Sequence, residues 1–206
     1  TLSDWSLLPA VLTGGASGGG NGGAARFTAP SGTVSSLTIT NYDMYLDWFV
    51  DGQTNWLRAG NITIQNLGRI RHARNTATTT NAGVFIDCQN LTIETGGQID
   101  VNALGFLGGF RAAEGSPANA LGHGGYTTNM GGGGGYGGAG GACSNGAHGG
   151  ATYDSAPNPA TPGSGGGGGG LGFSQWDWPY GGAGGGYIRI KASGTVTVGG
   201  NGITAN

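Results

Sequence analysis

The sequence predicts an all-β protein: a β-solenoid or a β-sandwich of short repeated strands, with a glycine-rich insertion packed as polyglycine-type helices. Two observations lead to this prediction. A short triplet of apolar residue, Thr and apolar residue recurs along the chain, and glycine supplies 50 of the 206 residues. The glycines lack the strict three-residue repeat of collagen. Charged residues make up only 9% of the chain, whereas about 25% is usual.

Composition and pattern divide the chain into four segments. Residues 1–30 are an apolar and glycine-rich N-terminal segment, and residues 31–104 carry the β-strand repeats. Residues 105–186 are the glycine-rich insertion. Residues 187–206 hold a final β-repeat, which we assign to the same domain as residues 31–104.

The N-terminal segment opens with "TLSDWSLLPAVLTGG". Pro9 prevents a long helix there. An apolar end of this kind is unfavourable in water. We expect it to fold back as a cap on the repeats or to dock on a neighbouring subunit. The candidate contact residues are Leu2, Trp5, Leu7, Leu8, Val11 and Leu12.

The strand repeats follow one pattern, in which alternation puts two apolar side chains on one face and Thr on the other. The copies are Leu37-Thr38-Ile39, Ile62-Thr63-Ile64, Leu91-Thr92-Ile93 and Val196-Thr197-Val198. Gly68 and Gly97 follow the second and third copies at the same offset. Each unit is too small to bury its own face, so the units must stack. We expect the apolar members to stack in register inside one body; a parallel β-helix and an antiparallel sandwich both remain open.

The segment from 41 to 60 also alternates between apolar and polar residues. Asp51-Gly52 is a turn signal between two apolar runs, which predicts a hairpin with Trp48 near Trp56. These aromatic residues would serve as core or as a binding surface.

The glycine-rich insertion differs from a flexible linker because large apolar residues punctuate it. Glycine strands can pack closely as three-residue helices and bond backbone to backbone, which only glycine permits. We therefore expect the runs 131–135 and 165–170 to pack as polyglycine-type helices; a disordered loop is the alternative. The candidate ligand-facing aromatic residues of the insertion are Tyr136, Trp176, Trp178 and Tyr180.

Two cysteines, Cys88 and Cys143, allow one disulfide or two buried free thiols. A zinc site would need help from the histidines, which are His72, His123 and His148, but their spacing matches no metal motif. We predict no cofactor and no metal.

Most kinds of chemistry lack a signature in this sequence. A net charge of −2 gives no basic footprint for nucleic acid, and no apolar run is long enough to span a bilayer. The glycine runs lack the Lys-Ser/Thr ending of a phosphate loop, and no Gly-x-Ser-x-Gly motif is present.

Acidic residues suggest only weak candidates for a site. A solenoid that cleaves polysaccharides can carry acidic clusters on one face, but outward strand positions favour solubilising charge for these residues: Asp43, Asp47, Asp51, Asp87, Glu94 and Asp100. In the insertion, Asp154 and Asp177 are weak candidates for Ca²⁺ ligands. We predict that the protein is not an enzyme.

Three stretches carry a resemblance to known proteins. The stretches "GGGGGYGGAGGACSNGAHGG", "PGSGGGGGGLG" and "GGAGGGYIRIKASGTVTVGGNGITAN" resemble glycine-rich secreted bacterial surface proteins with β-solenoid repeats. The glycine blocks also resemble, in composition, phage tail-fibre adhesins built from polyglycine helices. Either resemblance implies an extracellular protein with a structural or adhesive role.

These observations predict a secreted structural protein that assembles head to tail with copies of itself into an extracellular filament or surface layer. The alternative is an adhesin, such as a phage tail-fibre tip, that binds a cell-surface glycan or receptor. The first residue, Thr1, fits a mature chain whose signal peptide has been removed, or a partial sequence.

Overall fold

The computed structural model is all-β, with one short 3-10 turn and no α-helix in the part of the chain that it describes. The described residues are 4–14, 24–27, 31–46, 56–75, 82–109, 124–125, 130–144, 146–155, 157–168, 181–199 and 202–206. The chain divides into two compact units. Unit 1 comprises Thr1–Ala73, Ala82–Asp100 and Ile188–Thr204, and unit 2 comprises Arg74–Asn81, Val101–Tyr187 and Ala205–Asn206.

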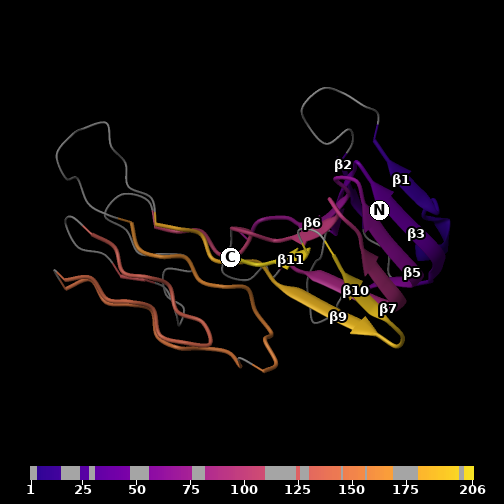
Figure 1. Ribbon diagram of the computed structural model, residues 1–206. Helices are drawn as coiled ribbons and strands as arrows, with labels where there is room; N and C mark the ends of the chain where they lie inside the picture. The colour runs from indigo at the N-terminus through magenta and orange to yellow at the C-terminus, as the bar shows by residue number, and fades with distance from the viewer. Residues whose placement is uncertain are drawn as a thin grey trace. The chain divides into compact units, whose positions relative to one another are not determined.

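Unit 1 contains two sheets (Figure 1). Sheet A consists of β1 (Val11–Thr13), β3 (Val34–Thr40), β5 (Leu57–Gln65), β7 (Val84–Ile93), β9 (Ile188–Ala192) and β10 (Val196–Val198). Sheet B consists of β2 (Ala24–Phe27), β4 (Asp43–Leu46), β6 (Arg69–His72), β8 (Gln98–Asp100) and β11 (Gly202–Thr204). The turn η1 (Trp5–Leu7) precedes β1.

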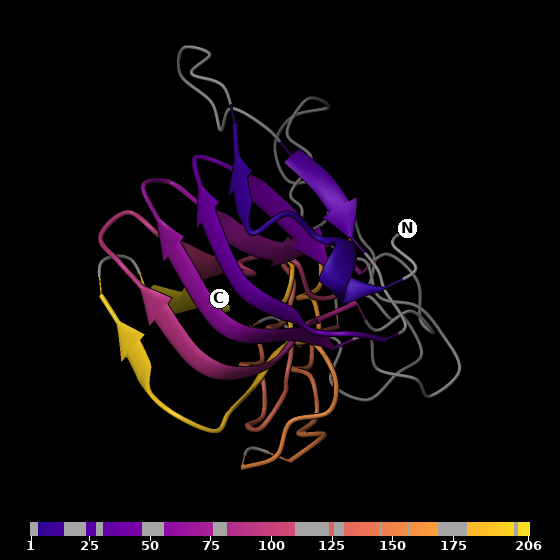
Figure 2. The same cartoon turned by 90° about the vertical axis from the view of Figure 1, so that its right-hand side faces the viewer.

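The chain passes from sheet A to sheet B and back again. Sheet A has the order β1-β3-β5-β7-β10, with β9 also on β7, and sheet B has the order β11-β8-β6-β4-β2. Figure 2 shows the strands of a sheet running side by side in chain order. All pairs between the named strands are parallel. We call a sheet A strand and the sheet B strand after it a layer; the first layer is β1 and β2, and the last layer is β9, β10 and β11.

The predicted stacking of the triplets is confirmed by the strand register. Leu37 pairs with Ile62, Ile62 with Leu91, and Leu91 with Val196. The second apolar column runs from Leu12 through Ile39, Ile64 and Ile93 to Val198. Sheet B adds a third column: Ala25, Met44, Ile70, Ile99 and Ile203. The middle members of these columns form the core and are almost fully buried.

The repeated glycines have a steric explanation. A Cβ on Gly68 would overlap the carbonyl oxygen of Ile39, and a Cβ on Gly97 would overlap that of Ile64. The turns from sheet A to sheet B therefore stack too closely for any side chain at this offset. The Gln98 amide, for example, donates to the Gly68 carbonyl at 3.1 Å in the layer before it.

The predicted hairpin over residues 41 to 60 is wrong for its described part. β4 pairs with β2 and β6 in sheet B, whereas β5 pairs with β3 and β7 in sheet A. Alternation predicts a strand but not its partner, and stacking between layers replaced the local pairing. Trp48 and the Asp51-Gly52 turn lie outside the described residues.

Unit 2 contains the glycine-rich insertion, and its described glycine segments are joined by backbone hydrogen bonds. Segment 105–109 bonds to segment 163–167 and to segment 181–185, and the last two also bond to each other. A flat sheet cannot place three strands so that each lies beside both others. This arrangement is therefore a three-dimensional bundle of backbones.

The hydrogen bonds in this bundle recur every third residue. Phe106 donates to Gly163 and Gly109 donates to Gly166, at 2.9 and 2.8 Å. Gly184 donates to Phe106 and Gly181 donates to Gly109, each at 2.9 Å. The structure assigns no helix in the described residues of unit 2, so the predicted polyglycine-type helices are not seen as secondary structure.

Candidate functional site

The last layer of unit 1 leaves its apolar columns uncovered. In the layer beneath it, Leu91, Ile93 and Ile99 are at most 1% exposed. Their partners in the last layer are 46%, 49% and 39% exposed: Val196, Val198 and Ile203. The side chains face the same interior, so the difference arises because no further strand among the described residues pairs with β10 or β11 on that side. This apolar surface, Val196, Val198 and Ile203, is our candidate functional site.

The strand edges at both ends of unit 1 carry little protection against pairing. Natural edge strands are usually guarded by charge, Pro or bulges. Among the end strands, β1 reads VLT, β10 reads VTV and β11 reads GIT, without a charged residue, whereas β2 reads AARF and carries Arg26. The charges of the last layer lie on β9, where the Lys191 ammonium sits 4.3 Å from the centre of the Trp56 ring.

The N-terminal apolar segment is divided between the two predicted roles. Trp5, Leu8 and Leu12 are buried within the subunit, which favours the cap, and η1 packs against β3 and β5. Leu7 and Val11 are 62% and 53% exposed and remain available for a subunit contact. Leu2 lies outside the described residues.

Among the predicted ligand-facing aromatic residues, only Tyr136 is described, and it is engaged within unit 2. Its hydroxyl lies 2.7 Å from the Thr161 carbonyl and 3.1 Å from Asp154 Oδ2, and its ring packs edge-on against Tyr153 at 5.1 Å. Burial, followed by the bond to Asp154, raises the pKa of Tyr136. These contacts favour a packing role. Trp176, Trp178 and Tyr180 lie outside the described residues.

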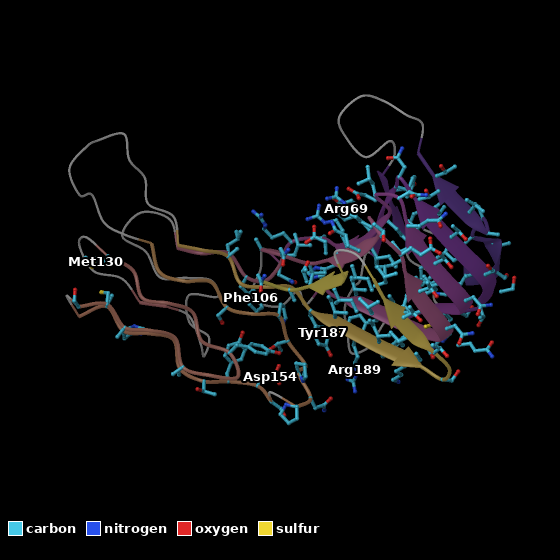
Figure 3. All side chains as sticks on the ribbon, in the orientation of Figure 1. Arg69, Phe106, Met130, Asp154, Tyr187 and Arg189 are labelled. Carbon is cyan, nitrogen blue, oxygen red and sulfur yellow. The ribbon has the colours of Figure 1, made fainter. Side chains whose placement is uncertain are left out.

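Asp154, in unit 2 (Figure 3), is saturated by hydrogen bonds rather than open to a cation. Its carboxylate accepts from the amides of Ser155, Ala160 and Thr161 at 2.7 to 2.8 Å. Burial acts to raise the pKa of Asp154, but these bonds outweigh it and lower the pKa to about 2. We therefore assign Asp154 a structural role, in which its carboxylate fixes the loop that ends at Thr161. Asp177, the other Ca²⁺ candidate, is outside the described residues.

Asp43 and Asp100 are buried and contact an arginine of a neighbouring layer, so the outward, solubilising position expected for these two residues is wrong. Arg69 holds Asp43 through two bonds of 2.7 Å (Arg69 is labelled in Figure 3), and Arg71 Nη2 lies 3.3 Å from Asp100. Asp87 and Glu94 are exposed, and Asp47 and Asp51 are not described. The described residues bring together no group of three or more His, Cys, Asp or Glu that could hold a metal ion.

The cysteines lie in different units. Cys88 is buried on β7 in unit 1, and burial raises the pKa of its thiol. Cys143 is half-buried in unit 2, where its Sγ lies 3.2 Å from the Ala147 amide. The structure does not join the two sulfurs, so the disulfide stays a prediction.

Among the described histidines, His72 is fully buried on β6, and we expect it to make unit 1 sensitive to acid. Its Nδ1 donates to the Ala73 carbonyl at 2.7 Å, and burial is the main cause that lowers the pKa of His72 to about 4. The unfolded chain, with a His pKa of 6.5, binds the proton more readily. Stability is therefore lost as the pH falls from about 6.5 to about 4, by about 3 kcal/mol in total.

Urea unfolding of the native protein and a His72→Leu variant at several pH values tests this prediction. The variant removes the titrating group, so the difference in stability between the two proteins should change across that pH range. The carboxylates titrate in both proteins and cancel. A constant difference from pH 7 to pH 4 would contradict the assignment. His148, the other described histidine, is exposed; His123 is not described.

No helix in the described residues is long and apolar enough to cross a membrane. Comparison with known proteins gives no family assignment, because no family model matches the chain and no curated protein or solved structure is significantly similar to it.

Proposed function

We propose that this chain is a secreted structural protein, a subunit that assembles into an extracellular filament or surface layer. The observation that carries the proposal is the uncovered last layer. Its apolar columns and open strand edges are suited to a further layer, and a protein that exposes them has a strong tendency to associate.

We infer that unit 1 is a β-solenoid. The support is the alternation of the chain between two parallel sheets, with triplets in register from layer to layer. Parallel pairing favours the solenoid over the antiparallel sandwich. A solenoid is a one-dimensional stack in which each repeat contacts only its neighbours, so it can be extended at its ends.

We also infer that the glycine segments of unit 2 are polyglycine-type helices. The three-residue recurrence of their hydrogen bonds matches a helix with three residues per turn, and a β-ladder would repeat every two residues. Bonds to two neighbours on different sides also fit such a helix. A rigid glycine bundle would serve a structural role as a spacer or as a lateral contact.

The alternative function, a glycan- or receptor-binding adhesin, gains no support from the described residues. The hydroxyl of Tyr136 is used within its own unit. A well-dispersed monomer or trimer that binds a cell surface would favour this alternative.

Electron microscopy and pelleting assays on the purified protein test the proposed function. The native protein should form filaments or sheets. Charging both columns with Val196→Lys and Val198→Lys should abolish polymers while leaving the circular dichroism of the fold unchanged, because both side chains are about half exposed. A variant with Val196→Ile and Val198→Ile, which keeps both columns apolar and adds no charge to the edge strand, is the matched control and should retain most of the polymer. Absence of polymer from the native protein, or equal polymer from the doubly charged variant, would refute the proposal.

A further inference from the structure

We infer that the last layer of one subunit is covered by the first layer of a second copy, with β10 paired in parallel to β1 and β11 paired to β2. This inference rests on the proposed function and names the partner and its register. In that register Val11 lies over Thr197, Leu12 lies over Val198, and Ala25 lies over Ile203.

The columns of sheet A specify the residue type that must follow. Thr38, Thr63, Thr92 and Thr197 occupy one outward column, and Val11 pairs with Thr38 at its beginning. The neighbouring inward column is apolar in every layer and begins with Leu12. A first layer placed on β10 therefore repeats the pattern: Leu12, which is only 7% exposed within its own subunit, continues the inward column over Val198, and the 53% exposed, β-branched Val11 lies outward over Thr197.

Sheet B gives the same answer independently. Its inward column begins with Ala25 and ends with Ile203. An Ala over the 39% exposed Ile203 provides an apolar neighbour without crowding it. Ala25 and Ile203 are both uncharged, and the charged residue of β2 is Arg26, the next residue along the strand. The proposed contact continues the packing that already joins the layers inside the subunit.

Strand direction selects the head-to-tail arrangement. Two last layers related by a two-fold axis would pair antiparallel, and the columns would then lose their register. The first layer lies at the opposite end of each sheet, no further described strand pairs with its outer edge, and this edge runs in the same direction as β10 and β11. Such a contact is heterologous, and it propagates as an open filament unless the rotation closes a ring.

Disulfide trapping tests the register directly. Neighbouring strands lie about 4.8 Å apart, and a disulfide requires Cα atoms about 4.4–6.8 Å apart. A chain with Val11→Cys and Thr197→Cys, in a Cys143→Ser background, should form a ladder of covalent oligomers under mild oxidation. The two new cysteines cannot pair within one subunit, because β3, β5 and β7 separate their strands.

The matched control is the offset pair Thr13→Cys with Thr197→Cys, in which the sulfurs are displaced by two residues along the strand, roughly 7 Å. This chain should give few covalent oligomers. If the offset pair cross-links as well as the aligned pair, the register is wrong. If the single variant Thr197→Cys yields mainly covalent dimers, the last layers meet each other and the inference is overturned.

The outcomes also separate this inference from the proposed function. If the native protein polymerises but the aligned cysteine pair does not cross-link, the proposed register is wrong and the proposed filament function still stands. If the aligned cysteine pair cross-links but the native protein never forms polymers, the contact between the layers is supported and the proposed filament function is wrong.

Discussion

Replacing Ile93 with Ala should lower the free energy of unfolding of unit 1 by about 2–5 kcal/mol, the range for deleting a large buried aliphatic side chain. Ile93 is 1% exposed and lies between Ile64 and Val198 in its column. The strands above and below are held by backbone bonds, so they cannot close the cavity easily.

Urea unfolding followed by tryptophan fluorescence measures the effect, and Thr92→Ala on the outward face of the same strand is the control. We expect the control to change the free energy of unfolding by less than about 0.5 kcal/mol. A similarly small effect for Ile93→Ala would show that the columns do not form the core in solution.

Replacing Gly181 with Ala should destabilise unit 2 by about 1–3 kcal/mol or more, the cost of overpacking. A Cβ on Gly181 would overlap backbone atoms of Gly166 and Gly167. A backbone has no rotamer that could move aside, so the segments must separate and weaken their hydrogen bonds.

The neighbouring Gly182 supplies a matched control, because a Cβ there meets nothing within 4 Å. Gly182→Ala should be neutral or slightly stabilising, since Ala restricts the unfolded chain more than Gly does. Thermal unfolding and limited proteolysis report on both variants. Equal tolerance of the two substitutions would contradict the close packing of glycine backbones.

The sequence predicted the strand repeats well because its signal is local. Each triplet carries its alternation within three residues, and Gly68 and Gly97 mark the stacked turns at a constant offset. The partner of each strand is a non-local property, which is why a hairpin was expected around Asp51 and a parallel stack was found. The sequence likewise could not predict which apolar residues of the N-terminal segment are buried, such as Trp5, and which are exposed, such as Leu7.

The sequence predicted the columns to which the candidate site belongs, but not that its residues are exposed. Val196 and Val198 were expected inside the stack together with Leu91 and Ile93, and they do lie in the same columns. Exposure depends on whether another layer follows, and the triplet itself contains no information about that. The function of Tyr136 was hidden for a related reason, because its partner Thr161 lies far along a segment without a regular period.

The glycine-rich insertion separates β8 from β9 along the sequence, although β7 and β9 are neighbouring strands. This separation has a consequence for the order of folding. Asn61 bonds to Asn90 across 29 residues, whereas Asn90 bonds to the Thr195 amide across 105 residues. Closing the longer loop costs roughly 1 kcal/mol more chain entropy, and contacts between distant residues slow folding. We therefore expect the inner layers to form first and the last layer to arrive late. The surface proposed for polymerisation would then be completed at the end of folding, which limits the time in which immature chains could join a growing fibre.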